Sequence, residues 1–130
     1  MAIPAGDLVV AADIGTSSVK VGLVDRALSI VTATKVDLPL SRPGPHRAEQ
    51  DPESWWSAFA LGLRNLLQSD RSLAGRIAGL VFAAQMCGVV ATDGDGRPLR
   101  PCMVWLDKRA GHLMRASLGG WPEIAGYNAF

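Results

Sequence analysis

Residues 8–25, LVVAADIGTSSVKVGLVD, decide which fold this chain can adopt. Residues 8–12 form a short apolar run, typical of a strand buried on both faces, and Asp13 adds a carboxylate at the end of that strand. Residues 19–24, VKVGLV, carry apolar side chains at alternate positions, which predicts a second strand. We therefore expect a β-hairpin with a charged group at the edge of a sheet, where a ligand can reach it.

The turn of this hairpin is rich in groups that can bind an anion. Its small and hydroxyl-bearing residues are Gly15, Thr16, Ser17 and Ser18. Glycine allows a close approach to the backbone, and clustered amide and hydroxyl donors suit an oxyanion such as phosphate. Lys20 would add positive charge on the polar side of the second strand, and Asp13 could hold a hydrated Mg²⁺. The alternative is an ordinary hairpin whose turn is polar because most turns are.

Two other nucleotide-binding patterns are excluded. The chain contains no GxxxxGK[ST] sequence. A dinucleotide-binding fingerprint requires the glycine turn to open a helix, whereas residues 19–24 are rich in β-branched valine and predict a strand.

Composition places the chain among globular proteins. Of its 130 residues 48% are hydrophobic and 19% are charged, and the net charge is +1. The 13 basic residues are scattered among 12 acidic ones, so no nucleic-acid partner is expected. The longest weakly polar run, residues 77–91, is too short to span a bilayer and is interpreted as buried sheet. The start of the sequence has no basic signal-peptide segment, and its two cysteines lack metal-ligand spacing, so we expect a cytoplasmic protein without a membrane partner.

Further elements extend the predicted hairpin into an α/β domain. The β-branched residues of 28–38 predict a third strand in an antiparallel meander, and the prolines of 39–50 indicate a loop. Asp51 and Pro52 are typical of a helix start, and the helix should end near Gln68. Its expected apolar face comprises Trp56, Phe59, Ala60, Leu63, Leu66 and Leu67. Residues 77–84 should then return as a strand parallel to the first, through a right-handed crossover.

The last third of the sequence predicts shorter elements. Residues 89–92 are expected as a strand that leads into the turn DGDG, and residues 102–106 as a short strand. Asp107 is then expected to cap a helix that ends near Leu118. Its predicted inner side comprises Ala110, Leu113, Met114 and Ser117, and the residues expected to stop it are Gly119, Gly120 and Pro122.

A second group of polar residues is expected beside Asp13. Ligands gather at the carboxyl ends of parallel strands, and Gln85 leaves the sheet at the same edge as Asp13. Gln85 offers both a donor and an acceptor, Trp105 offers a flat ring with an indole N–H, and Asp107 with Arg109 forms a charged pair that could orient hydroxyl groups. A purely structural alternative is that Asp107 caps a helix and that Arg109 faces water.

Three segments resemble known proteins. Residues 13–25, DIGTSSVKVGLVD, are similar to the first phosphate-binding hairpin of the sugar kinase, actin and Hsp70 superfamily. EQDPESWWSAF (49–59) and AAQMCGVVATDGDGRPLRPCMVWLDKRA (83–110) resemble the EQDPxxWW and xQMHGxxxxDxxGxxLxPxxxWxDxR segments of the xylulokinase-like FGGY carbohydrate kinases. The resemblance implies a ribonuclease H-like, actin-like ATPase domain with a mixed sheet, three antiparallel strands followed by a parallel one, and helices packed on the sheet.

The resemblance also implies an activity, namely ATP- and Mg²⁺-dependent phosphorylation of a hydroxyl on a ketopentose, such as xylulose or ribulose, or on a polyol. Gln85, Met86 and Trp105 match residues that line the sugar pocket, and Asp107 with Arg109 matches the closing charged motif. Cys87 stands where xylulokinase-like members carry a histidine that contacts the sugar, which puts xylulose itself in question.

Members of this family are several times longer than 130 residues. The resemblance therefore implies a truncated first domain in residues 1–130, with the catalytic aspartate and the nucleotide domain beyond Phe130, and an inactive fragment of a protein that could be a homodimer. An actin-like assembly ATPase and a non-catalytic sugar-binding module are the alternatives.

Overall fold

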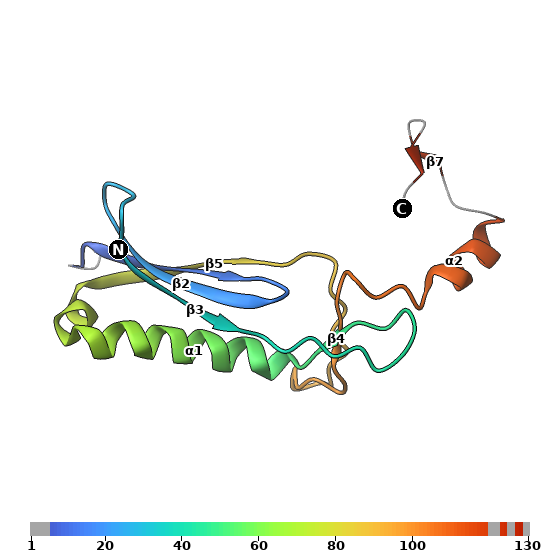
Figure 1. The fold of residues 1–130 in the computed structure, drawn as a ribbon, viewed down its shortest axis with the longest axis horizontal. Helices are drawn as coiled ribbons and strands as arrows, with labels where there is room; N and C mark the ends of the chain where they lie inside the picture. Colours follow the sequence, from blue (N-terminus) through green and yellow to red (C-terminus); the bar gives the residue numbers. More distant parts are fainter. Residues whose placement is uncertain (1–5, 120–122, 125–126, 129–130) are drawn as a thin grey trace.

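The structure is a computed structural model that describes residues 6–119, 123–124 and 127–128. A four-stranded sheet has the strand order β3 (Ile30–Asp37), β2 (Ser18–Asp25), β1 (Leu8–Ile14), β5 (Ile77–Ala84). Helix α1 (Pro52–Ser69) runs along one face of this sheet, and no other described element covers the opposite face (Figure 1). The expected mixed α/β architecture, an antiparallel meander followed by a parallel strand, is confirmed.

The hairpin forms as predicted. β1 (Leu8–Ile14) pairs antiparallel with β2 (Ser18–Asp25), and Asp13 lies directly opposite Lys20. Alternate residues of both strands face α1 and are buried: Leu8, Val10, Ala12, Val19, Val21 and Leu23. The expectation that β1 is buried on both faces is wrong for the described chain, because Val9, on the other face, is 38% exposed.

β3 (Ile30–Asp37) begins later than predicted, because a turn occupies the residues before it. Leu28 has a φ of 62°, and its amide donates to the Asp25 carbonyl oxygen. The Asp25 carboxylate accepts from the amides of Ala27 and Ser29. These bonds hold residues 25–29 in a turn, so pairing with β2 begins only at Ile30.

α1 (Pro52–Ser69) begins and ends where the sequence indicated. The Asp51 carboxylate accepts from the Glu53 amide at 3.0 Å, as an N-cap should. Most of the expected apolar face packs on the core, since Phe59 and Leu66 are buried and Leu63 and Leu67 lie against them. Trp56 is the exception at 64% exposed, and Ala58 and Gly62 are buried in addition.

A short 3₁₀ helix, η1 (Arg71–Arg76), leads into β5 (Ile77–Ala84), which pairs parallel with β1. The interpretation of this stretch as buried sheet is wrong in the described chain. Leu80, Val81 and Phe82 are 55%, 54% and 48% exposed. β5 is the edge strand of the sheet, so no described strand lies on its outer side.

The expected loop 39–50 contains a short strand, β4 (Glu49–Gln50), which pairs with β6 (Cys102–Met103). Residues 102–106 and 89–92 were both expected as strands, but β6 ends at Met103, and Val89 and Thr92 form only isolated bridges. A small core of Ala48, Cys102 and Val104 stabilises this two-stranded sheet.

α2 (Gly111–Leu118) is not capped by Asp107. Its N-cap residue is Ala110, which makes no side-chain cap bond, because the Asp107 carboxylate is bound to other groups. α2 extends away from the sheet (Figure 1), and its expected inner residues Leu113 and Met114 are 60% and 37% exposed, so of the two α-helices in the described residues α1 alone packs on the sheet.

Gly119 ends α2, as expected, and has the left-handed conformation, whereas Gly120 and Pro122 lie outside the described residues. β7 (Glu123–Ile124) and β8 (Tyr127–Asn128) form a two-residue antiparallel pair. Within the described ranges, no helix has the length and apolar character needed to cross a membrane.

Candidate sugar and phosphate site

The turn between β1 and β2 is tight, and it leaves little room for a side chain at Gly15. The Gly15 amide donates to the Ser18 carbonyl oxygen at 3.0 Å. A Cβ at Gly15 would lie 3.2 Å from that same oxygen, so the backbone of the turn would have to shift by a few tenths of an ångström to accept it. Ser17 is exposed at the turn, and Ser18 is buried at the start of β2.

Asp13 and Lys20 form a cross-strand ion pair beside this turn, with Lys20 Nζ 2.9 Å from Asp13 Oδ2. Their side chains are 50% and 61% exposed, and both lie along a hollow on the sheet face opposite α1. An exposed pair of this kind contributes little to stability. The Asp13 carboxylate is therefore accessible to a ligand at little cost to the fold.

Three of the predicted site residues are joined by hydrogen bonds at the end of the sheet. The backbone N–H of Gln85 donates to the Ile14 carbonyl oxygen at 2.8 Å, which places Gln85 directly beside the hairpin turn. The Thr16 hydroxyl donates to Gln85 Oε1 at 3.0 Å and accepts from Trp105 Nε1 at 2.9 Å. The turn and two of the residues expected to face a sugar thus form one continuous surface.

These bonds restrict what Thr16 can offer to a phosphate. A hydroxyl has one hydrogen to donate, and the hydrogen of Thr16 is directed at Gln85. In this arrangement only the backbone of Thr16 could donate to an oxyanion.

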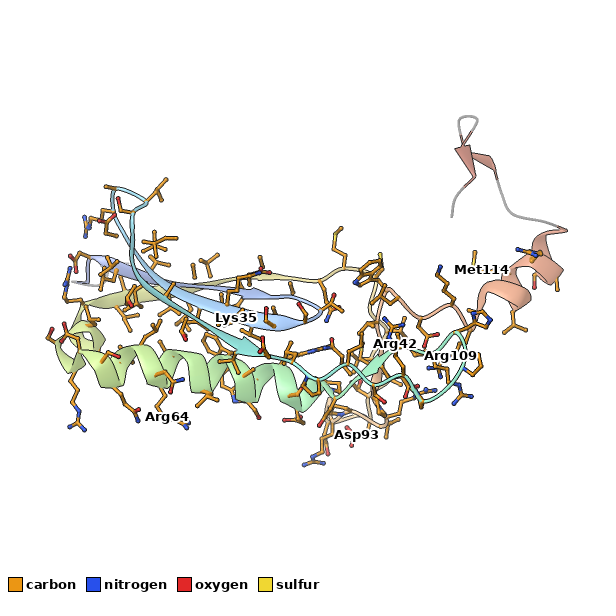
Figure 2. All side chains as sticks on the ribbon, viewed as in Figure 1. Lys35, Arg42, Arg64, Asp93, Arg109 and Met114 are labelled. Atoms are coloured by element: carbon orange, nitrogen blue, oxygen red, sulfur yellow. The ribbon has the colours of Figure 1, made fainter. Side chains whose placement is uncertain are left out.

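Asp107 and Arg109 lie in a charged cluster instead of at a helix cap. Arg109 binds both carboxylate oxygens of Asp107 and also reaches Glu49 of β4, and Asp107 Oδ2 accepts from the Ala48 amide at 2.9 Å. The Arg109 guanidinium lowers the pKa of the Asp107 carboxyl through its hydrogen bonds to that carboxylate, and it lowers the pKa of Glu49 through a separate hydrogen bond. Figure 2 labels Arg109 near β4, and the ion pair with Glu49 joins it to that strand.

Met86 and Cys87 follow Gln85 on an exposed loop. Met86 is 79% exposed, and Cys87 has an exposed thiol and a φ of 59°. The structure brings them to the same end of the sheet as Gln85, but no described side chain encloses them.

Gln50 also belongs to this site, although no sequence pattern predicted it. This residue is 1% exposed, and its side-chain amide contacts Gln85 and the Thr16 carbonyl oxygen. Gln50 was noticed only as part of EQDPESWWSAF, because a glutamine that precedes a helix cap carries no chemical signal of its own.

Few of the described side chains could act as metal ligands. Among the described residues, no group of three or more histidine, cysteine, aspartate or glutamate side chains could hold a metal. A single accessible carboxylate such as that of Asp13 still fits Mg²⁺, which keeps several waters and is commonly bound by one or two carboxylates plus phosphate oxygens.

A family model described as the N-terminal domain of the FGGY family of carbohydrate kinases matches residues 8–117. The chain belongs to this FGGY family. A xylulose kinase of Staphylococcus epidermidis is 34% identical over 94% of the chain and 25% of that protein. A xylulose kinase of Escherichia coli is 39% identical over 75% of the chain and 20% of that protein.

Solved structures agree with this assignment. A xyloylose kinase from Brucella ovis matches with a TM-score of 0.80 and 35% identity over 85% of the chain. A xylulose kinase from Rhodospirillum rubrum matches with a TM-score of 0.79 and 29% identity over 86% of the chain. The FGGY chain covers 23% of each of these structures, so it spans about a quarter of the length of its relatives.

Proposed function

We propose that this FGGY chain is the first part of an ATP-dependent kinase that phosphorylates a hydroxyl group of a small ketose or polyol. Its family membership supports the reaction class. The observation that carries the proposal is the position of Thr16, whose hydroxyl is bonded both to Gln85 and to Trp105. A phosphate turn in contact with a sugar-facing amide and ring is the arrangement that transfer between two bound substrates requires.

In this proposal the residues divide between two tasks. Asp13 would organise Mg²⁺, which neutralises phosphate charge when it is bound, and the backbone of residues 16–18 with Lys20 would hold the β- and γ-phosphates. Gly15 would shape the turn, since its own amide is bonded within it. Gln85 and Trp105 would bind hydroxyl groups and the CH face of the sugar, and Met86 and Cys87 would line the same pocket. Asp107 and Arg109 would act indirectly, because their charges are paired with each other and with Glu49.

The proposed substrate is a ketopentose. The relatives named above are xylulose kinases, which supports a substrate of this size. Cys87 is a weaker hydrogen-bond partner than the histidine expected there, so ribulose and small polyols belong in the same test.

Residues 1–130 would form part of the sugar-binding domain, and the catalytic base and the nucleotide domain would lie in the rest of the protein. The 130-residue segment alone would be inactive, because transfer needs a closed site with both substrates in place. An assembly ATPase is disfavoured by the family match, which extends over the segments that carry Gln85 and Trp105. A homodimer and a cytoplasmic location stay predictions.

The test is substrate turnover by the protein as its gene encodes it, with pentuloses, tetritols and glycerol as acceptors. Asp13→Asn should lower kcat by at least about a hundred-fold and change sugar binding by less than about three-fold, because the lost carboxylate acts on the phosphate side. The matched control is Asp37→Asn, since Asp37 is also an exposed carboxylate paired with a sheet lysine, Lys35 (Figure 2 labels Lys35). Turnover of Asp13→Asn within a few-fold of wild type would disprove the metal assignment.

A further inference from the structure

The side-chain amide of Gln50 is hydrogen-bonded at every position. Its Nε2 donates to the Thr16 carbonyl oxygen at 2.7 Å and to the Pro39 carbonyl oxygen at 3.3 Å. Its Oε1 accepts from Gln85 Nε2 at 2.8 Å and from Trp55 Nε1 at 3.2 Å. Every hydrogen-bonding position of the amide is therefore used, in a side chain that is only 1% exposed.

These contacts permit only one orientation of the Gln50 amide. If the amide were turned over, its nitrogen would face two N–H donors and its oxygen would face two carbonyl oxygens. Four favourable contacts would be replaced by four unfavourable ones, in a place that water cannot reach. Gln50 is thus a fixed reference point for the groups around it.

The bonds of Gln50 close a ring with the phosphate turn. Thr16 donates through its hydroxyl to Gln85, Gln85 donates to Gln50, and Gln50 donates back to the carbonyl oxygen of Thr16. Trp105 is attached to this ring through the Thr16 hydroxyl. A change at Gln50 would therefore be transmitted to Gln85, to Thr16 and to Trp105.

The ring also decides which part of Gln85 is available to a ligand. A glutamine amide has two N–H donors and two oxygen lone pairs. Gln50 occupies one N–H of Gln85, and the Thr16 hydroxyl occupies one lone pair of its oxygen. One donor and one acceptor are therefore left for the hydroxyl groups of a sugar.

We propose that Gln50 is a positioning residue that orients the Gln85 amide and the Thr16 hydroxyl, and through them Trp105, for binding of the sugar. Gln50 itself does not touch the substrate. The proposal rests on the proposed function, since it takes Gln85 to face the sugar.

The test uses Gln50→Glu in the protein as its gene encodes it. A glutamate has nearly the same shape and still accepts from Gln85 and Trp55, but a carboxylate cannot donate to the Thr16 and Pro39 carbonyl oxygens. We expect the sugar kcat/KM to fall at least about ten-fold, mainly through KM, as the loss of one or two buried hydrogen bonds implies. The sugar kcat/KM of Gln50→Met should be lower still, because methionine loses all four bonds.

Two controls separate positioning from general damage. Gln68→Glu makes the same chemical change at an exposed position of α1 and should leave kcat/KM unchanged. Leu66→Ala destabilises the core beneath the same helix without touching the ring, and its folded fraction should keep a sugar KM within about two-fold of wild type. If the Gln50 variants fold poorly, Trp55→Phe removes the 3.2 Å bond together with part of a ring that packs on the core, and it should give an effect of about two- to three-fold in the same direction.

A spectroscopic readout is independent of turnover. In ¹⁵N-tryptophan spectra, the indole N–H signal of Trp105 should shift, and its exchange with water should quicken, in Gln50→Glu but not in Leu66→Ala. An unchanged Trp105 signal, or a sugar KM equal to wild type in Gln50→Glu, would overturn the inference. A wild-type protein that phosphorylates none of the acceptors would instead overturn the proposed function, and the Trp105 signal would still decide whether the ring exists.

Discussion

Gly62 sets how closely α1 lies on the hairpin, and Gly62→Ala is expected to destabilise the protein. Glycine inside a helix normally costs about 1 kcal/mol relative to alanine, so the substitution should stabilise an unconstrained helix by that amount. Here the added Cβ would lie 2.8 Å from Val21 Cγ2 and 3.5 Å from Thr34 Cγ2. Val21 is 1% exposed and β-branched, so its methyl group cannot move aside without moving β2.

Overpacking of a close-packed core costs about 1–3 kcal/mol. Subtracting the helix-propensity gain leaves a net loss of about 1 kcal/mol in the free energy of unfolding. Urea unfolding of the two proteins, monitored by circular dichroism, measures this difference, provided that the two unfolding curves have the same m-value. The intrinsic helix term is measured separately as the difference between Arg64→Ala and Arg64→Gly, because Arg64 is an exposed residue of the same helix (Figure 2 labels it).

The sign of the effect should reverse when Val21 is shortened. In a Val21→Ala background the clash with Cγ2 is gone and the new methyl group partly fills the space, so Gly62→Ala should stabilise by about 1 kcal/mol. The double-mutant cycle therefore has a coupling energy of about 2 kcal/mol. Stabilisation by Gly62→Ala in the wild-type background, or the same value in both backgrounds, would refute the close-packing argument.

Two other features of the chain give further predictions. The pKa of Asp107 is lowered in the folded state by its bonds to Arg109, so its contribution to stability is present above the ordinary carboxyl pKa of 3.8 and is lost as the pH falls through the lower folded value. The Tm difference between wild type and Asp107→Asn should accordingly be larger at about pH 7 than at about pH 3, and a difference that is constant with pH would contradict this. An alkylating reagent should label the exposed Cys87 but not the native Cys102, because Cys102 is 0% exposed and burial raises the pKa of its thiol. A sugar that the kinase phosphorylates should slow labelling of Cys87. Equal labelling rates with and without sugar would show that Cys87 does not line the sugar pocket.

Features set by neighbouring residues could be predicted from the sequence. The β1–β2 hairpin follows from alternation within a few residues, and the start of α1 follows from Asp51 and Pro52 side by side. The parallel pairing of β5 with β1 follows from the apolar run of residues 77–84, which comes after helix α1. In each case the groups that interact lie within one element or in consecutive elements, so the chain itself brings them together.

Other features were decided only when distant segments met. Asp107 could cap a helix or bind Arg109 and the Ala48 amide, and the second choice became available because β4 pairs with β6. The role of Gln50 likewise depends on groups brought from Thr16, Pro39 and Gln85. A buried amide or carboxylate must bind whichever partners surround it, since an unpaired polar group away from water is costly. The sequence by itself therefore determined the hairpin, the helix start and the family, whereas the tertiary structure decided which polar groups are free to meet a substrate and which ones hold the others in place.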